Sequence, residues 1–357
     1  MNKNVYCVIM AGGVGTRFWP KSRKSKPKQF LDIFDTGKSF LRLTYERFAD
    51  RVPAQNFLVV TNASYKHLVR EHLPEIAENQ ILCEPIGRNT APCICYAAYS
   101  LLKRNPEAKM IVTPSDHIIL DQTAFGEIID ELLGFIDSHD VLMTVGITPN
   151  RPETGYGYIQ KSDSQSISRV KCFTEKPNLE LAKVFVQSGE FFWNSGIFVW
   201  KVRDIIEAVE RWLPDHHALF SSIAGDLGTP TEAQAIERVF AQCRAVSIDY
   251  GVMEKADNVY VRCGDFGWSD VGTWGSLYQL TPKDENLNAK NDKCCFTFDT
   301  RNSIISLPKE KVAIISGLDN YIVVDTEDVL MICPRKEEQS IRKYIDEVKY
   351  HLGDKHN

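Results

Sequence analysis

The stretch Ala11-Gly12-Gly13-Val14-Gly15-Thr16-Arg17 follows directly on the apolar run Val5-Tyr6-Cys7-Val8-Ile9-Met10. The apolar run predicts a buried β-strand, and the glycines after it predict a loop at the carboxyl end of that strand. Glycines in such a loop let the backbone approach a ligand and turn its N–H groups toward phosphate oxygens. The stretch therefore indicates a phosphate-binding loop that opens an α/β fold.

Two widespread phosphate loops do not match this stretch. A nucleoside-triphosphate P-loop needs the pattern G-x-x-x-x-G-K-[ST], which does not occur in the chain. A dinucleotide-binding loop needs a third small residue where Phe18 stands, and an acidic residue where the second expected strand ends at Val59-Val60-Thr61-Asn62. A dinucleotide-dependent oxidoreductase is therefore disfavoured.

Short β-rich apolar runs alternate with segments of helical periodicity through the first 150 residues. This alternation predicts a Rossmann-like, mostly parallel sheet with helices on both faces, whose ligands bind beyond the carboxyl ends of the strands. We expect strands near 5–10, 57–61, 80–83, 109–113 and 141–147, and helices near 40–52, 64–73, 91–104 and 122–138.

The rest of the chain divides into two regions. Residues 155–283 follow a less regular order, typical of an insertion that completes a cleft, with elements expected at 168–174, 178–187, 191–200, 202–212 and 231–242. Beyond them we expect short strands near 295–298, 303–307, 312–316, 321–325 and 328–333, closed by a helix near 336–351. The sequence thus predicts a catalytic domain over 1–283 and a small β-rich domain over 284–357.

Composition and charge exclude several classes of protein. Hydrophobic residues make up 43% and charged residues 25% of the 357, which is typical of globular proteins and not of disordered ones. The net charge of -5, without a long basic tract, predicts no nucleic-acid partner. A small phosphorylated ligand would suit the one local basic cluster, at Lys21, Arg23, Lys24, Lys26 and Lys28.

The cysteines and the start of the chain bear on location. The 10 cysteines include no C-x-x-C pair, and most lie in apolar runs, as reduced thiols in a core do. The first apolar run has only about six residues, too few for a signal peptide or a membrane span. We therefore expect a cytoplasmic protein without a membrane segment.

The whole string from Ala11 to Phe30 resembles the phosphate-binding opening of the sugar-nucleotide pyrophosphorylases, and among them of the guanylyltransferases that act on mannose 1-phosphate. Lys21 stands where a leucine or other apolar residue is commoner. Seven further segments match this family in the same order, so the resemblance spans roughly residues 4–275. They are Glu84–Pro92, Thr113–His117, Gly155–Ile159, Thr174–Pro177, Trp193–Phe198, Ile248–Lys255 and Trp268–Trp274.

The resemblance implies transfer of a nucleotide from GTP to mannose 1-phosphate, giving GDP-mannose and pyrophosphate. The sugar phosphate must attack the α-phosphorus in line, so the site has to gather and disperse several negative charges. We expect Arg17 and Lys28 to be the catalytic cations, acting with the glycine loop. The implied nucleotide-binding residues are Ala11, Gly12, Gly13, Gly15, Thr16, Glu84, Gly87, Asn89, Thr90 and Ser115.

Asp116 and Asp270 are the metal ligands that the resemblance implies. Asp116 follows the strand expected at 109–113 and so lies at the carboxyl edge of the sheet. In the family the matching aspartates hold Mg²⁺ between the nucleotide and the sugar phosphate. Taken alone, Asp116 is more often a strand-end cap. His117 is expected to be structural, because an ionised phosphate needs no general base.

The resemblance also implies a set of sugar-binding residues: Glu153, Gly155, Glu175, Lys176 and Asn194. Asn194 matches the family residue that contacts the sugar, Glu175 one that reads its hydroxyls, and Lys176 would meet the sugar phosphate. The aromatic strand around Asn194 suggests an apolar wall, although such strands are more often core, and Tyr156 is open to a packing role alone.

Three questions stay open in the sequence. Arg88-Asn89-Thr90 matches the base-facing loop of the family but is equally typical of a helix N-cap. The sugar could instead be a heptose or fucose 1-phosphate. A catalytically silent member that binds GDP-mannose and regulates a partner is the rival of another class, but it should lack a residue of the set Arg17, Lys28, Asp116 and Asp270.

The tail from about 284 resembles the small β-domain that covers the catalytic domain in this family and often pairs subunits, so we expect a homodimer. The long form of the family adds a phosphomannose isomerase domain. This chain ends at Asn357 without one, and only the transferase activity is expected.

Overall fold

The computed structural model describes residues 2–290 and 294–357. The chain forms two compact units, which are described separately below. Unit 1 comprises Met1–Gly12, Thr44–Ser115 and Ile119–Trp268, and unit 2 comprises Gly13–Leu43, Asp116–Ile118 and Ser269–Asn357. The domain division expected at residue 283 stays a prediction, and residues 291–293 of the expected β-rich domain lie outside the described residues.

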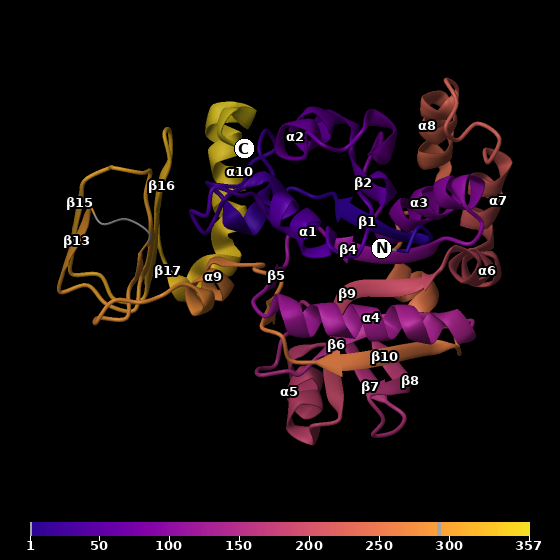
Figure 1. Ribbon diagram of the computed structural model, residues 1–357. Coiled ribbons are helices and arrows are strands. Elements are labelled where there is room, and N and C mark those ends of the chain that lie inside the picture. Colours follow the sequence, from indigo (N-terminus) through magenta and orange to yellow (C-terminus); the bar gives the residue numbers. More distant parts are fainter. Residues whose placement is uncertain (1, 291–293) are drawn as a thin grey trace. The chain divides into compact units, whose positions relative to one another are not determined.

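Unit 1 is built on a nine-stranded sheet in the order β3-β2-β1-β4-β9-β6-β10-β8-β7 (Figure 1). The pairs β3–β2, β2–β1, β1–β4 and β6–β10 are parallel, whereas β9 and β8 run antiparallel to their neighbours. The expected mostly parallel α/β sheet is confirmed. Its strands are β1 Val5–Ala11, β2 Phe57–Asn62, β3 Ile81–Glu84, β4 Lys109–Pro114, β6 Leu142–Ile147, β7 Tyr158–Lys161, β8 Ile167–Thr174, β9 Phe191–Lys201 and β10 Val259–Gly264.

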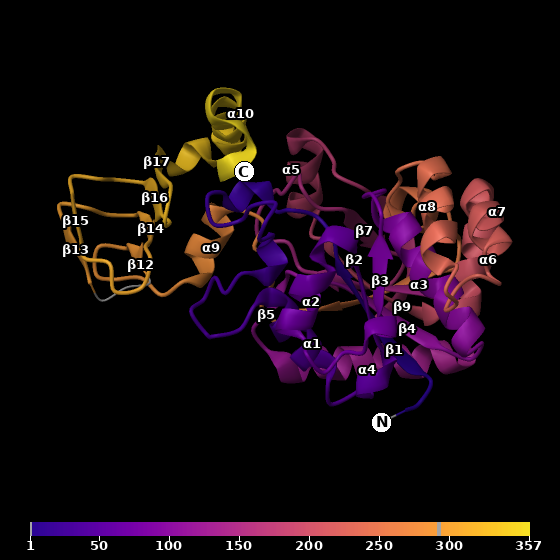
Figure 2. The same cartoon turned by 90° about the horizontal axis from the view of Figure 1, so that it is seen from above.

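Helices cover this sheet because its strands are apolar on both faces. Every residue of β6 is buried, as expected of a strand enclosed by two layers. The helices α3, α6, α7 and α8 share one core cluster with β1, β2, β4 and β9, while α4 packs against β9 and β10 (Figures 1 and 2). The helices are α1 Phe40–Phe48, α2 Lys66–His72, α3 Thr90–Arg104, α4 Gln122–Ser138, α5 Leu179–Ser188, α6 Val202–Trp212, α7 Pro214–Ser222 and α8 Glu232–Gln242. Within residues 2–290 and 294–357, no helix has the length and apolar character needed to span a membrane.

Unit 2 contains a coil of short strands (Figure 2), which pair in parallel except for the antiparallel pair β16–β17. Cys295 of β13 lies beside Ala313 of β15, and Ile304 of β14 lies beside Ile322 of β16. Inward isoleucines and valines of successive turns form its core. The five expected short strands are confirmed as β13 Cys295–Phe298, β14 Ile304–Ser306, β15 Ala313–Ser316, β16 Tyr321–Asp325 and β17 Leu330–Pro334, and the closing helix as α10 Ile341–Leu352. Strand β12 Ala289–Lys290 and helix α9 Trp274–Leu280 were not predicted.

The chain passes between the two units at five places, and two of them closely follow the ends of β1 and β4. Gly12 ends the first segment of unit 1, and Gly13 begins the first segment of unit 2. The same change occurs after Ser115 and after Trp268, where β5 Ile118–Ile119 and β11 Trp268–Ser269 lie. The predicted site residues therefore fall into two groups, one in each unit.

Candidate functional site

The glycine loop of unit 2 depends on backbone conformations that glycine adopts readily. Gly13 and Gly15 have φ of 85° and 72°, in the left-handed region. A Cβ at Gly15 would lie 2.6 Å from the Cβ of Lys28, so a side chain at this position would displace the lysine. Thr16–Phe18 then forms the 3-10 helix η1, which carries Arg17, a partly exposed side chain. The loop leaves Gly13 and Gly15 exposed to a ligand.

Lys28 joins the two predicted metal ligands. Its ammonium Nζ lies 2.8 Å from Asp116 Oδ2, 3.1 Å from the Asp116 carbonyl oxygen and 2.6 Å from the Asp270 carbonyl oxygen. The lysine is only 3% exposed, and its ammonium also lies over the rings of Phe18 and Phe40. Two aspartates 154 positions apart (116 and 270) are therefore held around one cation.

The electrostatics of Asp116 follow from this contact. Burial raises the pKa of Asp116, but the charge of Lys28, helped by His117 and hydrogen bonding, outweighs it and leaves the pKa below its usual value. The carboxylate is therefore ionised at neutral pH, as a metal ligand must be. The structural role expected of His117 stays a prediction.

Asp270 lies in a tight, strained turn. Its carboxylate Oδ1 accepts a hydrogen bond from the Gly272 N–H at 2.9 Å. Val271, between them, has φ of 44°, which is unusual for a β-branched residue. Such backbone strain often accompanies functional positions. The turn therefore fixes the orientation of the carboxylate.

The rest of the basic cluster is largely occupied by acidic partners within unit 2. Arg23 pairs with Asp328 at 2.5 Å, and Lys24 with Asp354 at 3.2 Å. The indole N–H of Trp19 donates to the His356 carbonyl at 2.8 Å. The C-terminal residues therefore hold the segment after Arg17. The sequence suggested that the basic cluster would face a small phosphorylated ligand, but Arg23 and Lys24 are paired with aspartates instead.

The predicted nucleotide-binding residues of unit 1 begin with Glu84, at the end of β3. Its side chain is 6% exposed, one carboxylate oxygen has no partner among the described residues, and Oε2 lies 4.0 Å from a Cβ placed on Gly12. Burial raises the pKa of Glu84 to about 7. A buried carboxyl oxygen without a hydrogen-bond partner destabilises the folded protein. A protein that keeps such a group often uses it to bind a ligand.

The remaining base-side residues have structural contacts of their own. Asn89 accepts a hydrogen bond from the Thr90 N–H at 2.8 Å, as the N-cap alternative requires. The Thr90 hydroxyl accepts from the Ile248 N–H at 2.9 Å, and Ser115 is buried, with its N–H bound to the Met10 carbonyl. Gly87 lies in an exposed turn with nothing near its missing side chain.

On the sugar side, Glu153 and Gly155 form one small loop. Glu153 Oε1 accepts from the Gly155 N–H at 3.1 Å, and Arg151 lies 3.4 Å from Oε2. The Glu153 backbone N–H donates to the Tyr158 hydroxyl at 2.9 Å. The loop is thus held by its own carboxylate and by the Tyr158 hydroxyl, and the backbone N–H groups of Glu153 and Gly155 are engaged within it.

Glu175, Lys176 and Asn194 lie around a residue that the sequence analysis did not select, Asp249. Lys176 and Glu175 form an ion pair, and the Asn194 side-chain N–H donates to Asp249 Oδ1 at 2.8 Å. Burial first, and then the charge of Glu175, raise the pKa of Asp249 to about 7. The structure therefore adds a second acid to the predicted sugar-binding group.

Aromatic side chains line the same region of unit 1. The ring of Tyr156 meets Trp193 at 5.2 Å and Trp268 at 5.3 Å between centroids, both edge to face. Trp193 is 3% exposed, so the aromatic run is partly core, as the alternative interpretation held. Tyr156 packs between two tryptophans, which supports the packing role considered for it.

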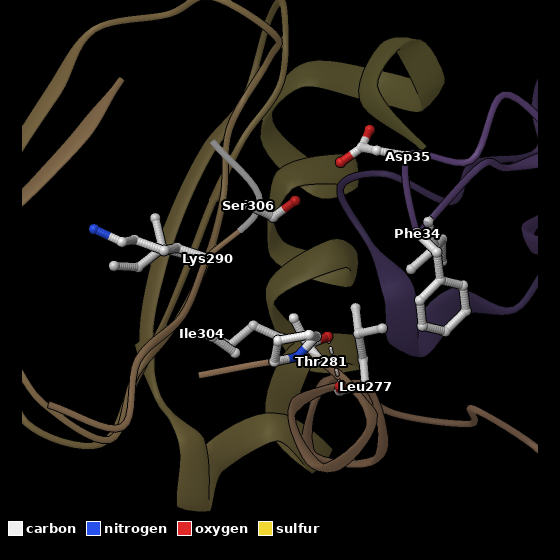
Figure 3. Close-up of a pocket in the computed structure, with 11 residues that line it drawn as sticks. Phe34, Asp35, Leu277, Thr281, Lys290, Ile304 and Ser306 are labelled. Atoms are coloured by element: carbon white, nitrogen blue, oxygen red, sulfur yellow. Dashed lines mark hydrogen bonds between the residues drawn. The ribbon is translucent and has the colours of Figure 1, made fainter. Parts of the chain in front are cut away.

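A separate pocket of about 220 Å³ lies in unit 2 (Figure 3). Phe34 and Asp35 border one side of it, Lys290, Ile304 and Ser306 the other, and its lining also includes Leu277 and Thr281 of the α9 end. None of the predicted site residues contributes to its lining. The pocket therefore plays no part in the chemistry considered below.

Comparisons with known proteins show the family to which the chain belongs. A family model described as Nucleotidyl transferase matches residues 6–286, and one described as MannoseP isomerase/GMP-like beta-helix domain matches 295–348. A Klebsiella pneumoniae relative named mannose-1-phosphate guanylyltransferase is 35% identical over 96% of this chain and 73% of its own length. An Escherichia coli relative of the same name is 35% identical over 97% of this chain and 76% of its own length.

A solved structure extends the similarity to the fold of nearly the whole chain. It is titled as mannose-1-phosphate geranyltransferase from Thermus thermophilus, with a TM-score of 0.87 and 30% sequence identity. The match covers 97% of this chain and 99% of the other. The sequence resemblance to sugar nucleotidyltransferases, and the α/β fold that it implied, are confirmed.

Proposed function

Because this chain belongs to the nucleotidyl transferase family, we propose that it is a mannose-1-phosphate guanylyltransferase, which converts GTP and mannose 1-phosphate into GDP-mannose and pyrophosphate. The observation that carries the proposal is the cluster of Lys28, Asp116 and Asp270, in which one buried ammonium contacts both aspartates. The names of the relatives supply the two substrates.

The reaction is a single displacement at the α-phosphorus of GTP. An oxygen of the sugar phosphate forms a bond to the α-phosphorus, and the bond from the α-phosphorus to the bridging oxygen of the β-phosphate breaks. Pyrophosphate leaves with that oxygen and its electron pair. Since the attacking phosphate is already ionised, no side chain has to remove a proton, and the protein mainly positions and neutralises charge.

The cations and amides of the glycine loop neutralise the triphosphate in this proposal. The exposed backbone of Gly13 and Gly15 offers N–H groups, and Arg17 offers a guanidinium one turn further along. Lys28 stabilises the charge that develops on the phosphates in the transition state. Lys28 is held by its contacts with Asp116 and Asp270 before substrate binds, which reduces the cost of reorganisation.

Asp116 and Asp270 fit a magnesium ion. Mg²⁺ binds through one or two carboxylates together with substrate phosphates, and these two aspartates are held together by Lys28. When bound, the metal would neutralise phosphate oxygens and favour their in-line arrangement. Lys28 holds Asp116 through its carbonyl oxygen and Oδ2, and Asp270 through its carbonyl oxygen alone.

Glu84 supports guanine as the base. Guanine presents two neighbouring donors, N1–H and the 2-amino group, whereas adenine presents an acceptor at N1. A buried carboxylate with an unpartnered oxygen accepts hydrogen bonds from the two guanine donors and repels the acceptor at N1 of adenine. In the proposed complex Glu84 therefore selects GTP over ATP.

Replacing Glu84 with glutamine is expected to lower kcat/KM for GTP by about 10- to 100-fold, the usual worth of hydrogen bonds to a charged group. The preference for GTP over inosine triphosphate, which lacks the 2-amino group, should shrink at the same time. Pyrophosphate release with the two nucleotides measures both effects. An unchanged preference would remove Glu84 from the base site.

The same variant carries a stability signature. The folded-state pKa of Glu84, about 7, exceeds the value of roughly 4.3 in unfolded chains, so its contribution to stability declines as pH rises from about 4.5 to 7. Glu84→Gln should therefore be more stable than wild type at pH 8, by at most on the order of 3 kcal/mol. Asp204→Asn is the matched control, since Asp204 is another buried carboxyl with a raised pKa; it should gain stability without changing nucleotide preference.

A homodimer is the proposed assembly, formed through the outer face of the β13–β15 sheet. Phe296 and Ile314 lie side by side in register on this face and are 53% and 73% exposed. Phe298 and Val312 extend the apolar surface. Contiguous apolar surface of this kind is typical of a protein interface.

Ile314→Glu is expected to convert the dimer into a monomer, because it places a charge in the middle of an apolar contact. Light scattering coupled to gel filtration measures the mass of each species. Lys309→Glu, an exposed change in the same unit, should leave the dimer intact. A wild-type protein that is monomeric at high concentration, or a dimeric Ile314→Glu variant, would contradict the proposed interface.

The proposed location is the cytoplasm. None of the cysteines among the described residues forms a disulfide, and several are buried, as Cys7 and Cys95 are. Proteins from reducing compartments keep their cysteines in this form. Both substrates of the proposed reaction are also phosphorylated metabolites, which such compartments hold.

The function is tested by pyrophosphate release from the purified protein with Mg²⁺. GTP, ATP, UTP and dTTP are crossed with the 1-phosphates of mannose, glucose, fucose and heptose. Strong activity at GTP with mannose 1-phosphate alone is the expected result. Activity with another pair would overturn the specificity, and silence at every pair, with GDP-mannose still binding, would favour a regulatory protein.

A further inference from the structure

Both predicted sugar-reading side chains of unit 1 are held by one short segment. This is the π-helix η6, Asp249–Met253, with Glu254 that follows it. Asp249 accepts from the Asn194 side chain, the Tyr250 hydroxyl donates to the Glu175 carbonyl at 3.2 Å, and Glu254 accepts from the Glu175 backbone N–H at 2.9 Å. π-Helical turns are rare and frequent at functional sites. The segment therefore holds two residues in place: Asn194 of β9 and Glu175, which directly follows β8.

The hydrogen bonds of Asn194 leave little freedom to its amide. Its Oδ1 lies 2.9 Å from the Thr144 hydroxyl and 3.3 Å from the Gly196 N–H, which both donate to it. One N–H of Nδ2 donates to Asp249. An asparagine amide has two N–H donors, so one N–H is left for a ligand. Asn194 is partly exposed.

Asp249 and the Gly196 N–H together decide which end of this amide faces the ligand, because the N–H only donates and keeps Oδ1, at 3.3 Å, while the carboxylate keeps Nδ2. A carboxylate can only accept hydrogen bonds when ionised, so it attracts the nitrogen end of Asn194 and excludes the oxygen end. Without that acceptor the amide could rotate by half a turn and present its oxygen instead. A sugar hydroxyl that accepts from Asn194 would then meet an acceptor, and the contact would be lost.

We infer that Asp249 is a positioning residue for the sugar substrate: it fixes the Asn194 amide so that one N–H donates to a sugar hydroxyl oxygen, while Glu175, held by the same turn, accepts a hydrogen bond from a neighbouring hydroxyl. This inference rests on the proposed function for the identity of the sugar. It assigns Asn194 and Glu175 opposite polarities toward two hydroxyls, which together recognise the stereochemistry of the sugar.

Three variants of Asp249 and a nearby acid test the inference. Asp249→Leu removes the acceptor and should raise KM for mannose 1-phosphate about ten-fold, with KM for GTP unchanged within about two-fold. Asp249→Asn keeps an acceptor oxygen and should restore KM to within about three-fold of wild type. Asp257→Leu, which changes an exposed acid beyond the end of that segment, should behave as wild type.

A double-mutant cycle with Asn194→Ala separates positioning from general damage to the fold. If Asp249 acts through Asn194, the change Asp249→Leu should have little further effect on KM once Asn194 is alanine. Additive effects of the two changes, or an unchanged KM in Asp249→Leu, would overturn the inference. Deoxy analogues of mannose 1-phosphate identify the hydroxyl, because the analogue lacking it should be insensitive to Asp249→Leu.

A second readout does not depend on catalysis. In protein with ¹⁵N-labelled asparagine, the side-chain amide resonance of Asn194, assigned with Asn194→Ala, should shift in Asp249→Leu and return toward wild type in Asp249→Asn. An unshifted resonance would contradict the hydrogen bond on which the inference depends. A protein that shows the shift but turns over no mannose 1-phosphate would retain the positioning contact and refute the proposed substrate, so the two failures are distinguishable.

Discussion

Lys28→Met is expected to lower turnover by about 10³-fold, since it removes a fixed cation from the phosphates of the transition state. It should also lower the free energy of unfolding by about 2 to 3 kcal/mol. The methionine leaves the Asp116 carboxylate without its cation and leaves the Asp270 carbonyl without its donor. Breaking a fully buried ion pair typically costs about 3–5 kcal/mol, and the one-third exposure of the Asp116 side chain reduces that figure.

Two measurements separate the effects of this change. Denaturant unfolding gives the stability, and pyrophosphate release at a temperature well below the unfolding transition gives the turnover of the folded variant. Lys26→Met is the control, because Lys26 is an exposed lysine two positions away. A folded Lys28→Met protein that retained more than a tenth of wild-type turnover would show that Lys28 only supports the fold.

The strands of unit 1 could be predicted because parallel strands leave a strong signal. A strand enclosed by helices is apolar along its whole length, and β2 and β6 show that pattern in the sequence. The strands β7 and β10 were not predicted, because this signal is weak in them. β7 has only four residues, and β10 carries Arg262 in its middle, so neither forms a continuous apolar run.

The coil of unit 2 shows a second limit. Its strands could be placed individually, but their pairing could not, because Cys295 lies beside Ala313 and Phe296 beside Ile314 without any repeated sequence motif. Parallel pairing between short strands depends on the turns that connect them and on the core that they enclose. Both are properties of the stacked turns together and not of one segment.

The candidate site could likewise be predicted only in part. Asp116 could be placed at the edge of the sheet because it follows a predicted strand. Only the family resemblance connected it to Asp270, which lies far along the chain. Asp249 lay within a quoted motif without any chemical signal of its own. Its role depends on a hydrogen bond to Asn194, which no periodicity or spacing predicts. The buried, unpartnered state of Glu84 was equally invisible in the sequence.

Asp270→Asn is expected to lower turnover by about 10²- to 10³-fold while leaving the midpoint of thermal unfolding nearly unchanged. Asparagine keeps the oxygen that accepts from the Gly272 N–H, and the carbonyl that accepts from Lys28 belongs to the backbone. The local fold therefore survives, and the variant loses only one negative charge. The negative charge helps to bind a magnesium ion between the two phosphates. Its loss should therefore destabilise the transition state and lower turnover, while the packing of the fold stays the same.

The metal requirement of this variant is the sharpest measurement. Titration of turnover with Mg²⁺ should show a higher half-saturating concentration for Asp270→Asn, and binding of Mn²⁺ in the presence of nucleotide, followed by electron paramagnetic resonance, should weaken in parallel. Asp265→Asn, an exposed acid five positions earlier, is the matched control and should change neither. If Asp270→Asn reached near wild-type rates at saturating Mg²⁺ and bound Mn²⁺ normally, the aspartate would not be a metal ligand, and Asp116 with Lys28 would have to account for the charge of the site alone.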